Sequence, residues 1–217
     1  MRGNTKEIAK YELFDEMTRH LLEDDKPSYY INKQAGEGGL AEHPFSMLLK
    51  QKDTQQEPKH HPEGNVWKHT MLVVDEAAKV RVRSNEPKVF MWAALLHDIG
   101  KPDTTKRRGG KLTSYDHDKV GERLAAEFLE QCLKDREFIK SVAVLVRYHM
   151  HILYVLKNLP YADMKGLLRS VDVNELALLC LCDRLGRGKA DEKAEYQHYE
   201  AFRAVLLQKR ELLMFHQ

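Results

Sequence analysis

The segment Ala93–Lys101 constrains the fold more than any other part of the sequence. It reads AALLHDIGK, follows Trp92, and is apolar on nearly every helical face up to Leu96. A helix of this kind is expected to be surrounded by other helices. His97 and Asp98 come next, and burying two ionisable groups is costly unless something pairs them. A divalent cation is one such partner, because imidazole and carboxylate are ordinary metal ligands. A hydrogen-bonded pair at a helix end is the alternative.

The residues after Asp98 predict where this helix stops. Gly100 suits a left-handed position just beyond a helix C-terminus, and Pro102 is expected to prevent the helix from resuming. The basic segment Thr104–Lys111, with sequence TKRRGGK after its first residue, predicts a flexible loop. Such a loop is by default a solvated connection, but beside a metal site it is also suited to close over an anionic substrate.

Composition limits the functional classes. The chain has 217 residues, 42% hydrophobic and 31% charged, which is normal for one large globular domain. Its formal net charge of +2 does not indicate nucleic-acid or membrane binding, so any such contact has to come from local basic patches. Three cysteines form neither a disulfide framework nor a zinc knuckle. We find no secretory leader and no apolar run of membrane-spanning length, and we expect a cytoplasmic protein.

Helical periodicity dominates the chain, and no segment shows convincing strand alternation, so we predict an all-α fold. Three acidic or amide residues are expected N-caps: Asn65, Asp135 and Asp172, the last paired with Glu175 in an acidic capping box. We predict an N-terminal helical extension over residues 1–59 that packs on a core domain over residues 60–217. The expected helices cover residues 5–23, 65–82, 87–98, 115–132, 135–149, 172–185 and 192–215, with a short apolar stretch at 44–49.

Four further ionisable residues are predicted to point inward from separate helices. His69 lies beside Val66 and Val73 on an apolar face, and His117 lies in a first turn, where the helix dipole favours neutral, metal-binding imidazole. His149 continues an apolar face, whereas His151 points away from it. Asp183 would be costly to bury without a cation. Any one of them alone is most simply a satisfied core residue.

Together these residues resemble the HD-domain superfamily of metal-dependent phosphohydrolases, with its H…HD…D motif. Within that superfamily the chain is similar to the HD domain of bacterial CCA-adding enzymes. The similarity covers roughly residues 40 to 190, and the helical residues 5–50 also resemble the connector that precedes this domain in those enzymes. The stretches that carry it are HPEGNVWKHT (61–70), ALLHDIGK (94–101), His117 with Gly121, RYH (147–149) and CDRLGR (182–187).

The resemblance implies a site for one or two ions. His69, His97, Asp98 and Asp183 would hold the first, and Asp98 would bridge to a second ion bound also by His117 and His149. The set contains nitrogen and carboxylate ligands without thiolate, which suits Mn²⁺, Fe, Ni²⁺, Co²⁺ or Zn²⁺ better than Mg²⁺ alone.

Cations near these ligands are candidates for stabilising a phosphoryl group. Lys101 is the first of them, as a catalytic and substrate-binding residue. Arg184 is a further candidate catalytic residue, and Arg147 and Arg187 are candidate substrate-binding residues. Each arginine has an alternative interpretation as a solvent-exposed charge or an ion-pair partner.

The predicted reaction is attack of metal-activated water on a phosphomonoester or a 2′,3′-cyclic phosphodiester of a nucleotide or RNA end. The Gly-Ser and Asp-x-Asp elements of the nucleotidyltransferase head are not found here, so tRNA tail synthesis is not expected. The alternative is a non-catalytic module that binds nucleotide or RNA or regulates a partner. We find no DNA-binding motif and expect no membrane partner. The oligomeric state stays open.

Overall fold

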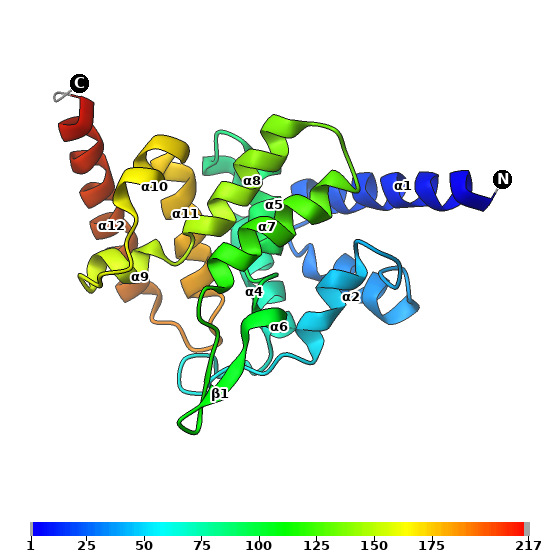
Figure 1. Ribbon diagram of the computed structural model, residues 1–217, viewed down its shortest axis with the longest axis horizontal. Helices are drawn as coiled ribbons and strands as arrows, with labels where there is room; N and C mark the ends of the chain where they lie inside the picture. Colours follow the sequence, from blue (N-terminus) through cyan, green and yellow to red (C-terminus); the bar gives the residue numbers. More distant parts are fainter. Residues whose placement is uncertain (1, 215–217) are drawn as a thin grey trace.

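The computed structural model describes the backbone of residues 2–214 and shows a helical protein with one small hairpin (Figure 1). The all-α prediction is confirmed. The predicted C-terminal helix is α12, and Phe215, its expected last residue, lies outside the described residues. The elements are α1 (Arg2–Glu23), α2 (Ser28–Glu37), α3 (Ser46–Leu49), η1 (Lys50–Lys52), α4 (Val66–Val80), η2 (Arg81–Arg83), α5 (Pro87–Leu96), α6 (Lys101–Thr104), β1 (Lys106–Arg108), β2 (Lys111–Thr113), α7 (His117–Glu130), α8 (Arg136–Tyr148), α9 (His151–Leu156), α10 (Met164–Ser170), α11 (Val173–Leu185) and α12 (Glu192–Met214).

Helix α5 lies at the centre of the molecule, as its sequence predicts. Every residue from Val89 to Leu96 is buried, with at most 7% of its surface exposed. Helices α1, α4, α8 and α11 all pack against it, and α7 pairs closely with α8 (Figure 1). A helix that is apolar all round is stable only in such a position, so α5 sets the place of the residues that follow it.

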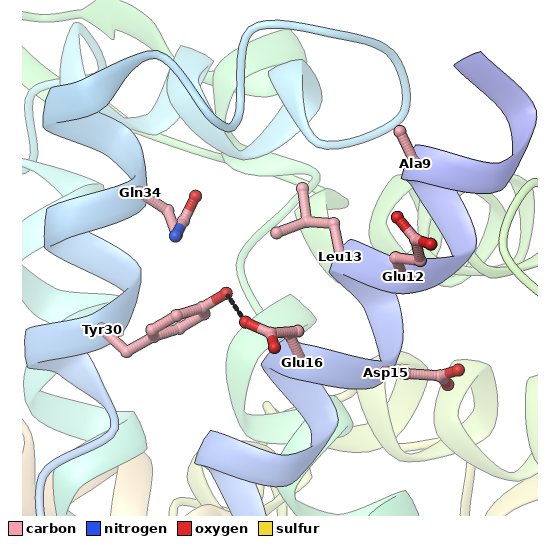
Figure 2. A pocket seen from close by; sticks show the side chains of 7 residues that line it. All are labelled: Ala9, Glu12, Leu13, Asp15, Glu16, Tyr30 and Gln34. Carbon is pink, nitrogen blue, oxygen red and sulfur yellow. Dashed lines mark hydrogen bonds between the residues drawn. The ribbon is translucent and has the colours of Figure 1, made fainter. Parts of the chain in front are cut away.

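The N-terminal helices share this core. The ring of Phe14 on α1 stacks on Trp92 of α5 with centroids 4.5 Å apart, and the Trp92 indole donates a hydrogen bond to Thr18. Helix α2 was not expected, because only Ser28 and Ile31 of its ten residues are buried. A hollow of about 540 Å³ lies between α1 and α2, where the Tyr30 hydroxyl donates to Glu16 (Figure 2).

The three predicted N-caps are confirmed. The side chains of Asn65, Asp135 and Asp172 each accept a hydrogen bond from a backbone N–H in the first turn of α4, α8 and α11. The capping box at Asp172 is only half formed, however. The Glu175 carboxylate instead accepts from the hydroxyl of Ser84 and the backbone N–H of residue 85, and so ties α11 to the start of α5.

Two predictions about the end of α5 were wrong. Gly100 is right-handed, with φ −82° and ψ −13°, and Pro102 lies in the first turn of a new helix, α6. Proline is well accommodated there, because its missing N–H has no partner in a first turn. The need for glycine is spatial: a Cβ at this position would lie 2.2 Å from the carbonyl oxygen of His117 and 2.6 Å from the nitrogen of Gly121.

The basic segment after α6 is an ordered hairpin rather than a flexible loop. Strands β1 and β2 pair antiparallel, with Lys106 opposite Thr113 and Arg108 opposite Lys111. Gly109 and Gly110 form the tip with positive φ, a conformation that glycine adopts without strain.

The segment Arg136–Leu156 is long and apolar enough to cross a membrane by length and composition, contrary to the expectation that no such run exists. It comprises α8 and α9, and 56% of its apolar window is buried inside the molecule. Core helices of soluble proteins pass the same test, so this is weak evidence of a membrane span. All three cysteines are buried and free, as predicted for core residues.

Candidate metal centre

Five helices bring the six predicted ligands to one place. His69 projects from α4, Asp183 from α11, and His117 is the first residue of α7; the other three follow directly after α5 or α8. Gly100 lets α7 approach the end of α5, which puts His117 next to Asp98. All six are buried, with exposed fractions of 0% for His69 and His97, 1% for Asp98 and His149, 5% for His117 and 4% for Asp183.

Asp98 lies at the middle of this cluster. Its Oδ2 is 3.3 Å from Nε2 of His97 and 3.8 Å from Nε2 of His69. Its Oδ1 is 3.5 Å from Nε2 of His117 and 3.7 Å from Nε2 of His149. The carboxylate therefore joins two groups of potential metal ligands, each formed by two histidines and Asp98 itself. Asp183 lies beside the first group, with Oδ1 3.0 Å from Nε2 of His69.

Backbone contacts fix the orientation of three rings. Nδ1 of His97, His117 and His149 lies 2.7–2.8 Å from the carbonyl oxygen three residues earlier in the chain. A carbonyl oxygen only accepts hydrogen bonds, so each Nδ1 carries the proton and each Nε2 presents a lone pair to the centre. This is the tautomer that a metal-binding histidine needs.

Several buried acceptors at the centre lack hydrogen-bond donors among the described residues. Nε2 of His97 and Oδ1 of Asp98 accept no hydrogen bond of normal geometry, and Oδ2 of Asp98 has the Lys101 ammonium at 2.7 Å as an ion-pair partner. Nε2 of His117 and Nε2 of His149 are 3.2 Å apart, with lone pairs facing each other because both protons are on Nδ1. Buried acceptors without a donor are costly. A divalent cation would satisfy all of them, so the residues fit a metal ion.

Burial and charge set the protonation of the ligands in the metal-free protein. Burial lowers the pKa of His117 to about 4 and also lowers the pKa of His149. Burial opposes ionisation of Asp98, but the Lys101 ammonium and His97 outweigh it and hold its pKa well below the usual range. For His69 burial is likewise outweighed, by Asp183 and Glu63, and its pKa is raised. Two histidines and Asp98 are thus in the deprotonated forms that bind metals.

Glu63 is a candidate functional residue that the sequence did not single out. Its Oε1 lies 2.9 Å from Nδ1 of His69, close enough for an ion pair although the angle is poor for a hydrogen bond. The same oxygen is 2.8 Å from Nδ1 of His61. Carboxylates commonly orient a metal-binding histidine through its second nitrogen. Glu63 lies within the HPEGNVWKHT stretch, but its contact with His69 depends on the turn before α4 and has no signal in the sequence.

Two of the predicted cations lie against the carboxylates of the centre. Nζ of Lys101 is 2.7 Å from Oδ2 of Asp98 and donates to Oε1 of Gln56 at 2.6 Å. Nη2 of Arg187 is 3.8 Å from Oδ2 of Asp183. The Nε of Arg187 is buried and has no hydrogen-bond partner in residues 8–213. Both side chains therefore lie beside carboxylates of the centre, where they could also contact a bound anionic substrate.

The other two arginines are held in ion pairs. Arg147 contacts Asp118 at 2.5 Å and approaches Glu122 at 3.7 Å. Arg184 pairs with Glu195 on α12 through two nitrogens. The ion-pair alternative thus describes both side chains as they lie here.

A hollow of about 360 Å³ adjoins the centre on the side of Arg187. Four cations contribute to its wall, and of its two acids Glu195 is already paired with Arg184 while Asp191 caps the N-terminus of α12. The lining residues are Lys59, His60, Pro62, Arg184, Arg187, Lys189, Ala190, Asp191 and Glu195.

The family model described as HD domain matches residues 66–188, which is more than half of the chain and includes all six ligands. The chain belongs to the HD domain family. The similarity found from the motifs is thereby confirmed at the level of the family. The domain boundary predicted at residues 59 and 60 stays a prediction.

Relatives of this HD domain protein carry the name Multifunctional CCA protein. The protein from Actinobacillus pleuropneumoniae serotype 5b is 32% identical over 139 residues, 62% of this chain and 32% of its own length. The protein from Pseudomonas syringae pv. syringae is 27% identical and covers 95% of this chain and 52% of its own length. The protein from Halorhodospira halophila is 30% identical, and the alignment covers 86% of this chain and 44% of the relative's own length. The chain thus spans about half the length, or less, of these relatives.

Proposed function

We propose that this HD domain protein is a metal-dependent phosphohydrolase of the cytoplasm. Its substrate is a phosphomonoester or a 2′,3′-cyclic phosphodiester of a nucleotide or RNA end. The observation that carries the proposal is the buried Asp98 carboxylate, whose two oxygens lie 3.3–3.8 Å from four imidazole nitrogens. A closed structural site needs only four ligands, whereas six are gathered here, and the similarity to CCA proteins supports a nucleotide or RNA substrate.

The ligands divide into two sets. His69, His97, Asp98 and Asp183 would hold the first ion, and Asp98 with His117 and His149 a second. When bound, a divalent transition metal supplies Lewis acidity and lowers the pKa of water to about 7. The nitrogen-rich set favours Mn²⁺, Fe, Ni²⁺, Co²⁺ or Zn²⁺, with Mg²⁺ the less suited ion.

Lys101 has the position of a phosphoryl-binding cation. Its side chain is 8% exposed, and Gln56 and Asp98 hold its amine from two sides. A cation in such a water-poor site stabilises negative charge more strongly than one in solvent. Arg187, with an unpartnered Nε, offers a second charge at the edge toward the hollow. For Arg147 and Arg184 the same role requires release from their present acids.

Hydrolysis of a phosphate panel by metal-depleted and then reconstituted protein tests the proposal. The panel includes a generic phosphomonoester, a phosphodiester, nucleoside monophosphates and a 2′,3′-cyclic nucleotide. We expect turnover that returns with metal, is lost in Asp98→Ala and is kept in the control Asp15→Ala on the exposed face of α1. If no metal restores turnover on any of these substrates, the protein is instead a nucleotide-binding or RNA-binding or regulatory module.

A further inference from the structure

The β1–β2 hairpin is strongly basic, and its lysine and arginine side chains have no ion-pair partner within the described part of the chain. Lys106, Arg107, Arg108 and Lys111 are all exposed, and none forms an ion pair. Arg107 donates to the carbonyl oxygen of residue 110, and Arg108 donates to the hydroxyl of Thr113, so both guanidinium groups are positioned by the hairpin itself. Four unneutralised charges on an ordered scaffold are a binding surface for a polyanion.

The base of the hairpin is built into the metal centre. The Thr105 hydroxyl donates a hydrogen bond to the carbonyl oxygen of Lys101. It also lies 2.7 Å from the hydroxyl of Ser114, and this hydrogen bond joins the two strands at the base of the hairpin. The carbonyl oxygen of Ser114 in turn fixes Nδ1 of His117. The hairpin therefore begins beside the cation that contacts Asp98 and ends beside a metal ligand.

Two further cationic segments gather at the same end of the molecule. The Glu57 carboxylate accepts from the backbone N–H of Leu112, which fixes the hairpin to the loop that carries Lys59. Lys59, Arg187 and Lys189 line the hollow beside the centre, and in the described residues neither lysine has an ion-pair partner. Figure 1 shows the hairpin, the 53–65 loop and the segment after α11 together at one end, away from α8 and α10.

We propose that the hairpin, together with Lys59, Arg187 and Lys189 at the hollow, binds the phosphate backbone of a single-stranded RNA whose phosphorylated end lies at the metal centre. Each strand of the hairpin has three residues and covers about 10 Å, and the cations at the hollow extend the charged surface beyond the hairpin itself. Tyr115 is 65% exposed beside Arg108 and offers a ring on which a base can stack. That this RNA is a substrate rests on the proposed function, whereas the binding of the RNA to the hairpin does not.

Fluorescence anisotropy with a labelled eight-nucleotide RNA bearing a 3′-phosphate tests the binding without catalysis, in metal-depleted full-length protein. The variant is Lys106→Ala/Arg107→Ala/Lys111→Ala, which spares Arg108 and its contact with Tyr115. The control is Lys134→Ala/Lys140→Ala/Lys165→Ala, with the same loss of charge on or beside α8 and α10 at the far end. Circular dichroism and thermal melting establish that both variants are folded.

The hairpin variant is expected to lose at least tenfold in affinity at low salt. Because each phosphate contact to a single strand contributes about 0.7 to the salt dependence, the slope of log K against log salt should fall by about 2. The control variant should bind as the wild-type protein does. An unchanged slope in the hairpin variant, or an equal loss in the control, would overturn the inference.

Kinetics with the reconstituted protein separate this inference from the proposed function. The hairpin variant should raise KM for the phosphorylated RNA several-fold more than KM for a generic phosphomonoester. Equal KM changes for the two substrates would contradict the inference even if hydrolysis itself is observed. Binding through the hairpin without hydrolysis of any substrate would leave the inference standing and overturn the proposed function.

Discussion

Each histidine of the centre has its second ring nitrogen held from inside the protein, but not by the same kind of group. Nδ1 of His97, His117 and His149 each donates a hydrogen bond to a backbone carbonyl oxygen. His69 alone faces a carboxylate, that of Glu63, which also contacts His61 and the backbone N–H of Gly188. Glu63 thus links the predicted metal ligand His69 to the segment that carries Arg187.

Replacing Glu63 by Gln should weaken metal binding more than it weakens the fold. The amide keeps the shape but loses the negative charge that makes His69 a better ligand, and loss of such a partner typically costs 10–100-fold in metal affinity. Competition with a chromophoric chelator measures the affinity, and Glu12→Gln on α1 is the matched control. Equal affinity in the two variants would show that Glu63 has no role at the centre.

His117 should make the metal-free protein sensitive to acid. Burial lowers its folded pKa to about 4, below the unfolded value of about 6.5, so its contribution to stability is complete above pH 6.5 and is lost as the pH falls toward 4. The free energy of unfolding should decline by up to about 1.4 kcal/mol per pH unit for such a histidine. His149 and His61 shift in the same direction, and the raised pKa of His69 opposes them.

Urea unfolding between pH 7 and pH 4.5 measures this effect. His117→Gln should show a shallower decline than the wild-type protein, because one group that must be protonated against burial has been removed. The exposed His60→Gln serves as control and should follow the wild-type curve. Parallel curves for all three proteins would contradict the assignment.

At the scale of elements, the centre depends on how closely α7 approaches the end of α5. Gly100 and Gly121 face each other there, and a Cβ on Gly121 would lie 3.1 Å from Val146 and 3.6 Å from the carbonyl oxygen of His97. A side chain at Gly100 would separate the helices, whereas one at Gly121 would require Val146 to move by a few tenths of an ångström. The distance between His117 and Asp98 therefore depends chiefly on the absence of a side chain at Gly100.

Gly100→Ala should destabilise the protein by about 1–3 kcal/mol, as overpacking does, and weaken metal binding at the same time. The atoms that its Cβ meets belong to the backbone of residues 117 and 121 and cannot rotate away. Gly36→Ala on α2 is the control, with nothing within 4 Å of its Cβ, and should be neutral or slightly stabilising. Denaturant unfolding and a metal titration give both values. A stable Gly100→Ala variant that binds metal normally would refute this account.

For the whole molecule, apolar periodicity predicted the helical core, and the resemblance to the HD-domain superfamily implied that the inward-facing ionisable residues converge on one site. It failed where tertiary contacts decide. Helix α2 buries too few residues to show a period, and the hairpin exposes its basic side chains, so it shows no alternation. Gly100 matched a helix-stop pattern, but its role is a close approach that no local pattern contains. The contact between Glu63 and His69 likewise depends on tertiary structure and has no local sequence pattern.

Six buried side chains are proposed to form one metal centre, and the metal content of the purified protein is the direct test of that centre. Wild-type protein loaded with Mn²⁺ or Ni²⁺ and dialysed should retain at least one ion per chain by elemental analysis. Asp98→Asn should retain none while keeping its helical content, and Asp15→Asn should match the wild-type protein. A wild-type protein that holds no ion, or an Asp98→Asn variant that holds as many, would contradict the account.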